Sequence, residues 1–101
     1  MGALNPEMIR ALHRSMVAQR RQHLLLIWGR GDVLLHQEQV YFEMVDGTAQ
    51  IRYTWTPDKR VSIALIEVWD PAEVHLMHRL DFPRDLALGD SVVFTFNLEI
   101  D

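Results

Sequence analysis

The sequence predicts an α+β domain: an N-terminal amphipathic helix packed on a curved antiparallel β-meander of five to seven strands. Two observations indicate this class. Apolar residues recur at helical spacing near the N-terminus, whereas alternation with a period of two dominates after residue 40. Strong turn signals then interrupt the alternation at residues 46–47, 56–60 and 70–73. Because short turns join neighbouring antiparallel strands, the pattern favours a meander.

Length and composition favour a single domain over residues 1–101. The chain is 49% hydrophobic and 24% charged, and its three Trp, four Phe and two Tyr can fill one core. It has no cysteine, which excludes disulfides, thiolate nucleophiles and cysteine-bound metals. The longest apolar run, residues 24–28, is too short to cross a bilayer, and no secretion signal precedes it. We therefore expect a soluble, cytoplasmic protein with no membrane partner.

The first element is a helix expected over residues 6–22. Asn5 can cap it, Pro6 suits the first helical position, and Glu7 carries negative charge in the first turn. An apolar stripe follows at spacings of three and four residues: Met8, Ile9, Leu12 and Met16. The spacing predicts a surface helix with one face toward the core.

Residues 24–28 form a continuous apolar run that ends at a Gly-rich segment, residues 29–32. This pattern is typical of a buried strand, with residues 32–36 as the return arm of a hairpin. The same run can instead prolong the helix. Both alternatives stay open at this point.

The Asp46-Gly47 pair predicts a two-residue hairpin turn, because both residues tolerate positive φ. Val45 then lies opposite Thr48, and the register follows from that pair. It gives further pairs on one core-facing side: Met44 with Ala49, Phe42 with Ile51 and Val40 with Tyr53.

Residues 61–69 are apolar on both faces, which is typical of a central strand covered on both sides. The helix is the expected cover for one face. The other face of residues 61–69 can be covered by the curvature of the sheet, by residues 23–36 or by another copy of the chain. This last alternative leads us to expect a homodimer.

Residues 70–73 fit a β-turn and also a helix start. The alternation over residues 74–82 fits a strand better than a helix, and residues 92–101 alternate in the same way. The chain is thus expected to end on a half-buried strand.

Glu67 and His78 are the candidate polar groups of a ligand pocket. Glu67 interrupts an apolar strand, so a buried carboxylate there can act as a base. His78 occupies one of the alternate positions, otherwise apolar, in residues 74–82. The expected pocket walls are aromatic: Tyr53, Trp55 and Phe94. The structural alternative places Glu67 in water or beside an arginine, and His78 in the core.

Metal and nucleic-acid sites are not expected. The closest histidines, His75 and His78, point to opposite faces of a strand, so we predict neither metal nor cofactor. The net charge of −4 argues against nucleic acid. The basic helix offers Arg10, Arg14 and Arg21 as candidates for binding an acidic protein surface.

These observations favour a non-catalytic protein-binding module of accessory, inhibitory or immunity type that self-associates through its sheet. The sequence contains no nucleophile motif and no phosphate-binding loop. The alternative is a small-ligand-binding or simple acid–base enzyme domain with a pocket between helix and sheet.

Overall fold

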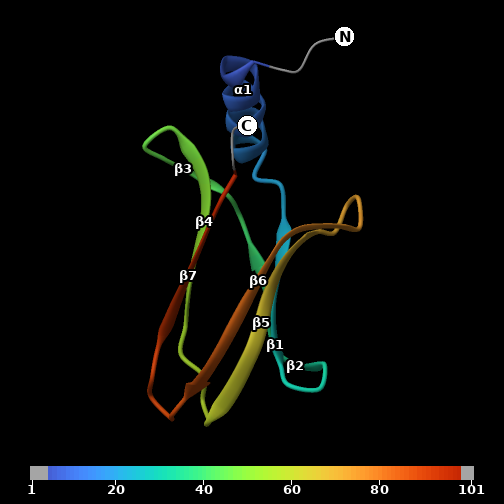
Figure 1. Cartoon of the computed structure of the whole chain (residues 1–101). Coiled ribbons are helices and arrows are strands. Elements are labelled where there is room, and N and C mark those ends of the chain that lie inside the picture. Colours follow the sequence, from blue (N-terminus) through green and yellow to red (C-terminus); the bar gives the residue numbers. More distant parts are fainter. Residues whose placement is uncertain (1–4, 99–101) are drawn as a thin grey trace.

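The computed structural model describes residues 5–98 and confirms the predicted fold class, with one helix and seven antiparallel strands in that range (Figure 1). The elements in chain order are α1 (Pro6–Ala18), β1 (His23–Gly29), β2 (Val33–Val40), β3 (Glu43–Val45), β4 (Thr48–Trp55), β5 (Val61–Asp70), β6 (His75–Leu86) and β7 (Val92–Asn97). The strands form a four-stranded sheet, ordered β2-β1-β5-β6, and a three-stranded sheet, ordered β3-β4-β7.

Helix α1 begins where predicted and ends earlier. The Asn5 side chain accepts a hydrogen bond from the Met8 N–H at 2.8 Å, and Pro6 occupies the first helical position. The helix ends at Ala18 instead of residue 22, because Arg20 adopts a positive φ of 52° that turns the backbone out of the helix.

Residues 23–40 form the β1–β2 hairpin, so the strand alternative was the right one. Gly31 and Asp32 adopt positive φ at its turn. Buried and half-buried positions alternate strictly along β1. Leu25 and Ile27 face the core and are fully buried, while the residues between them face the other way.

The Asp46-Gly47 turn is confirmed, with φ angles of 51° and 80°. Two predicted pairs, Val45 with Thr48 and Met44 with Ala49, are present. Val40, predicted to pair with Tyr53, instead ends β2 and pairs with His23. The β3 strand has three residues and pairs with β4 along Thr48–Gln50 in the described structure.

The expected strand pairing across residues 56–60 does not form. These residues carry the chain from the three-stranded to the four-stranded sheet, so β4 pairs with β7, and β5 lies between β1 and β6. The turn at residues 71–74 then leads into β6, which is the strand that the alternation predicts.

A bulge in β6 changes the expected placement of two histidines. His75 pairs with Asp70 and His78 with Val68, two residues apart on β5. Directly paired residues share a face, so His75 and His78 lie on the same face and not on opposite faces. The irregularity between Val68 and Trp69 makes the difference.

The core lies between the two sheets. Fully buried aliphatic side chains come from both sheets: Leu25, Ile27, Ile51, Ile63, Ile66 and Val68. Aromatic contacts join β6 to β7, with Phe82 edge-on to Phe94 at 5.4 Å between ring centroids. The three-stranded sheet therefore covers the inner face of β5, and the helix predicted for that role does not.

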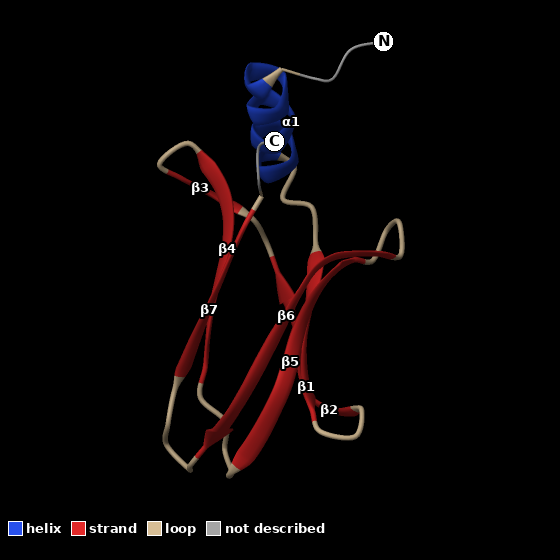
Figure 2. Cartoon of the chain, in the orientation of Figure 1, coloured by secondary structure: helices blue, strands red, loops and turns tan. Residues whose placement is uncertain are grey.

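Helix α1 contacts β3 and β4 and extends beyond the end of the sheets (Figure 2). Met16 and Val17, near its C-terminal end, pack against the core. Met8 and Leu12, members of the predicted apolar stripe, stay 50% and 58% exposed. Within residues 5–98, no helix is long and apolar enough to cross a membrane.

Candidate functional site

One candidate site lies where β2 meets β4. Strand β3 pairs only with residues 48–50 of β4, and no strand of the described chain pairs with the rest of that edge of β4. There the side chain of His36, from β2, contacts side chains of β4. The His36 Nε2 atom lies 3.0 Å from the Tyr53 hydroxyl oxygen. The imidazole also stacks on the Trp55 ring, with 5.4 Å between centroids and planes inclined by 21°. We call His36, Glu38, Tyr53 and Trp55 the seam cluster.

Two oxygen atoms of the seam cluster lie near one nitrogen of the His36 ring. The Glu38 carboxylate oxygen lies 3.3 Å from the same Nε2 of His36. A protonated Nε2 donates to Glu38 or Tyr53, whereas an unprotonated Nε2 accepts from the Tyr53 hydroxyl. Burial and, secondarily, the Glu38 charge raise the pKa of the Tyr53 phenol, which keeps it protonated. The phenol oxygen and the carboxylate oxygen thus both lie within 3.3 Å of one imidazole nitrogen.

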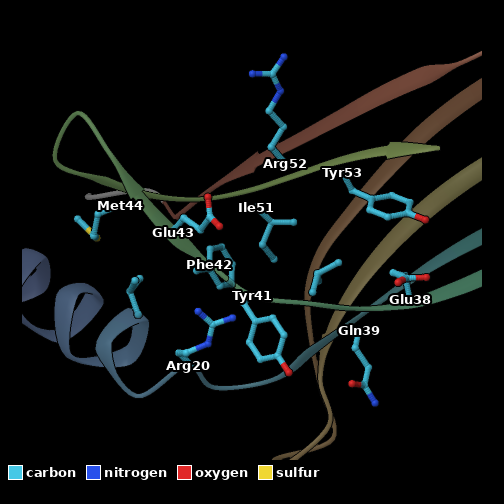
Figure 3. Close-up of a pocket in the computed structure, with 12 residues that line it drawn as sticks. Arg20, Glu38, Gln39, Tyr41, Phe42, Glu43, Met44, Ile51, Arg52 and Tyr53 are labelled. Carbon is cyan, nitrogen blue, oxygen red and sulfur yellow. The ribbon is translucent and has the colours of Figure 1, made fainter.

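Two hollows flank Tyr53. One of about 360 Å³ lies between the end of α1 and β2–β4, and the buried side chains of Phe42 and Ile51 line part of it (Figure 3). At its rim, the Arg20 guanidinium lies 4.9 Å from the centroid of the Tyr41 ring. The other hollow, of about 660 Å³, follows β4 toward residues 56–59. A small molecule could contact the seam cluster from either side.

A second candidate surface is the face of β1 and β5 that points away from the core. Three cross-strand pairs form it, which we call the outer patch: Leu24 with Trp69, Leu26 with Glu67, and Trp28 with Leu65. All six side chains are half-buried. Helix α1 packs on the other sheet, so it does not cover this patch. The outer patch is an apolar face with one carboxylate at its centre.

The carboxylate of Glu67 is held by two indoles. Its Oε1 atom accepts a hydrogen bond from Trp28 Nε1 at 2.7 Å and a longer one from Trp69 Nε1 at 3.4 Å. Arg79 of β6 pairs with Glu67 across the strands, and a hollow of about 200 Å³ is lined by both residues and Asp32. Within residues 5–98, Arg79 and Asp32 form no ion pair, and Glu67 Oε2 accepts no hydrogen bond.

His23 joins α1 to the core and is fully buried. Its Nδ1–H donates to the Arg21 carbonyl at 3.0 Å, and its ring lies edge-on to Phe42 at 4.9 Å. Its Nε2 atom is buried without a hydrogen-bond partner in the described structure. Burial lowers the pKa of His23 below its ordinary 6.5, so the ring stays neutral near neutral pH.

The structure separates the predicted pocket residues into three places. Tyr53 and Trp55 lie together in the seam cluster, and Phe94 lies in the core. Glu67 belongs to the outer patch, whereas His78 contacts the Phe96 ring between the sheets. Glu67 and His78 face opposite sides of the four-stranded sheet, because His78 pairs with Val68, the residue next to Glu67 on β5.

The pocket residues predicted from the sequence did not include His36 or Glu38. They are two residues apart on β2 and so share a strand face, which is the signal that could have found them. That signal was missed because the strand was expected to end at His36, whereas β2 continues to Val40.

Of the predicted partner-binding arginines, Arg10 and Arg14 are exposed on α1. Arg21 is engaged within the chain, since its guanidinium lies 2.7 Å from the Asp70 carboxylate and 3.5 Å from Glu73.

Among residues 5–98, no three His, Asp or Glu side chains gather closely enough to hold a metal ion. No protein family, curated protein or solved structure matches the chain.

Proposed function

We propose that this chain is a non-catalytic protein-binding module that self-associates through the outer face of its four-stranded sheet. The observation that supports this most is the apolar character of β1 and β5 on both faces. Leu25 and Ile66 face the core, while Leu24, Leu26 and Leu65 face the opposite way. When another surface covers such a face, its apolar side chains are removed from water, which lowers the free energy.

A second copy of the sheet is a suitable cover. Two sheet faces pack about 10 Å apart, the geometry of sandwich cores. A stable interface buries about 800 Å² on each partner, so strands β2 and β6 would contribute beside the outer patch. Aromatic residues such as Trp28 and Trp69 are enriched at such interfaces, because they combine a large apolar surface with a polar N–H.

Sedimentation equilibrium over a wide concentration range tests this function. We expect the native chain to dimerise as concentration rises. Leu26→Lys places a charge in the middle of the outer patch and should weaken dimerisation at least tenfold. Val93→Lys is the matched control, because Val93 is 48% exposed on the other sheet. A native chain that stays monomeric throughout would contradict the proposal.

A second candidate function is small-ligand binding or acid–base chemistry at the seam cluster. The specific observation in its favour is the His36 Nε2 atom, which lies within reach of both the Tyr53 hydroxyl and the Glu38 carboxylate. A general acid–base catalyst needs such a positioned proton donor and acceptor.

NMR observation of the His36 ring during a fragment screen tests the second candidate. Binding fragments should shift the His36 signals in the native chain and less so in Tyr53→Phe. The absence of any shift with a broad set of small polar and aromatic fragments would count against a ligand site.

A further inference from the structure

We infer that the outer patch binds a second copy about a twofold axis, with Arg79 of each copy paired to Glu67 of the other. This inference rests on the proposed self-association. It adds the register of the interface and the residues that determine partner choice.

Glu67 of the outer patch and its β6 neighbour Arg79 are an anion and a cation that form no ion pair with each other in the described structure. Glu67 uses Oε1 for the two indole N–H groups, and its Oε2 accepts no hydrogen bond within residues 5–98. Arg79 is exposed on β6 and has no ion-pair partner in that range. The indoles therefore hold the carboxylate in place and leave one oxygen for an incoming cation.

The positions of these charges make the face complementary to itself. In a twofold interface, residue i of one copy meets residue j of the other, and the reverse contact follows by symmetry. Glu67 and Arg79 are cross-strand neighbours on β5 and β6. A twofold axis in the interface plane that runs parallel to β5 and β6, midway between them, places Glu67 of each copy against Arg79 of the other, and no like charges of this pair meet.

The hollow beside Glu67 suits a guanidinium. Two carboxylates, Glu67 and Asp32, line it together with Trp28, Leu65 and the chain's own Arg79, so carboxylates outnumber the cation there. Arginine combines forked hydrogen bonding to carboxylates with stacking on aromatic rings, and its guanidinium is more weakly hydrated than an ammonium group. The ion pair then specifies register and partner more than it adds affinity, since desolvation offsets much of the attraction.

Charge reversal tests this pairing. Glu67→Lys alone brings two cations together at each contact, and Arg79→Glu alone brings two anions together, so each variant should dimerise at least tenfold more weakly than the native chain. In an equimolar mixture, both contacts of the heterodimer join opposite charges. We expect sedimentation and native mass spectrometry to show a heterodimer tighter than either variant homodimer.

The outcomes separate this inference from the proposed function. If the native chain dimerises and Leu26→Lys prevents it, while the charge-reversal mixture gains nothing, the Glu67–Arg79 pairing is wrong and self-association stands. A monomeric native chain overturns both. Because Glu67→Lys also loses its indole hydrogen bonds, a second measurement uses Glu67→Gln and Arg79→Gln in a double-mutant cycle of the dimerisation constant. Additive effects in that cycle would also overturn the pairing.

Discussion

Acidification should destabilise this protein through His23. The side chain is fully buried, its Nδ1–H is committed to the Arg21 carbonyl, and its Nε2 has no partner in the described structure. Protonation would therefore place an unpaired N–H and a positive charge in the core. Desolvation is the main cause of the lowered pKa; the hydrogen bond to the Arg21 carbonyl and then the nearby Asp70 carboxylate partly oppose it, and the Arg21 guanidinium adds to it.

Proton linkage gives the direction in which the free energy of unfolding changes with pH. The unfolded chain binds a proton at His23 near pH 6.5, whereas the folded chain binds it at lower pH. The stabilisation is complete above pH 6.5 and is lost as pH falls toward the folded-state pKa. The free energy of unfolding should then drop by up to about 1.4 kcal/mol per pH unit for this one proton. For a domain of this size, that slope lowers the melting temperature by roughly 5–10 °C per pH unit.

Thermal and urea unfolding between pH 7.5 and about pH 5, followed by circular dichroism, measures this slope. His23→Gln is the control, because glutamine is polar but does not titrate. The two proteins differ only at residue 23, so the difference between the two curves isolates His23. Parallel stability curves for the native chain and His23→Gln would refute the reasoning.

Three further predictions concern stability and can be measured by urea denaturation. Tyr53→Phe removes the hydroxyl that bonds His36 and should cost about 0.5–1.5 kcal/mol; an equal loss when His36 is already replaced by Gln would show that the two side chains are not coupled. Gly47→Ala should cost about 1 kcal/mol, because φ is +80° while the space around the new methyl group is open; an unchanged stability would contradict the left-handed turn. Phe94→Ala should cost about 3–5 kcal/mol by emptying a buried position, whereas Thr95→Ala, on the exposed side of the same strand, should change stability by no more than about 0.5 kcal/mol.

The features predicted correctly depend on neighbours within a few residues. The Asn5 cap, the Asp46-Gly47 turn and the strand character of residues 75–82 each follow from local backbone preference or from alternation over one element. The end of α1 was misplaced by four residues, because the backbone turn at Arg20 has no comparable local signal.

The candidate sites depend on contacts between distant parts of the chain. The Tyr53 hydroxyl meets a histidine from another sheet, and Glu67 meets the indole of Trp28, 39 residues away. Alternation shows that two side chains share a strand face, but it does not show which strand lies beside it. The predicted pocket was dispersed for that reason: its members come from different sheets or from opposite faces of one sheet.

By itself, the sequence determined the N-terminal helix, the strands after residue 40, several turns and the two-sided apolar character of β5. The tertiary structure alone decided that β4 pairs with β7, that the second sheet and not α1 covers β5, and that His36 joins the two sheets. The physical reason is that element type follows from short-range sterics and hydrogen bonding. Strand order instead follows from which faces bury the most apolar surface together, which is a property of the whole chain.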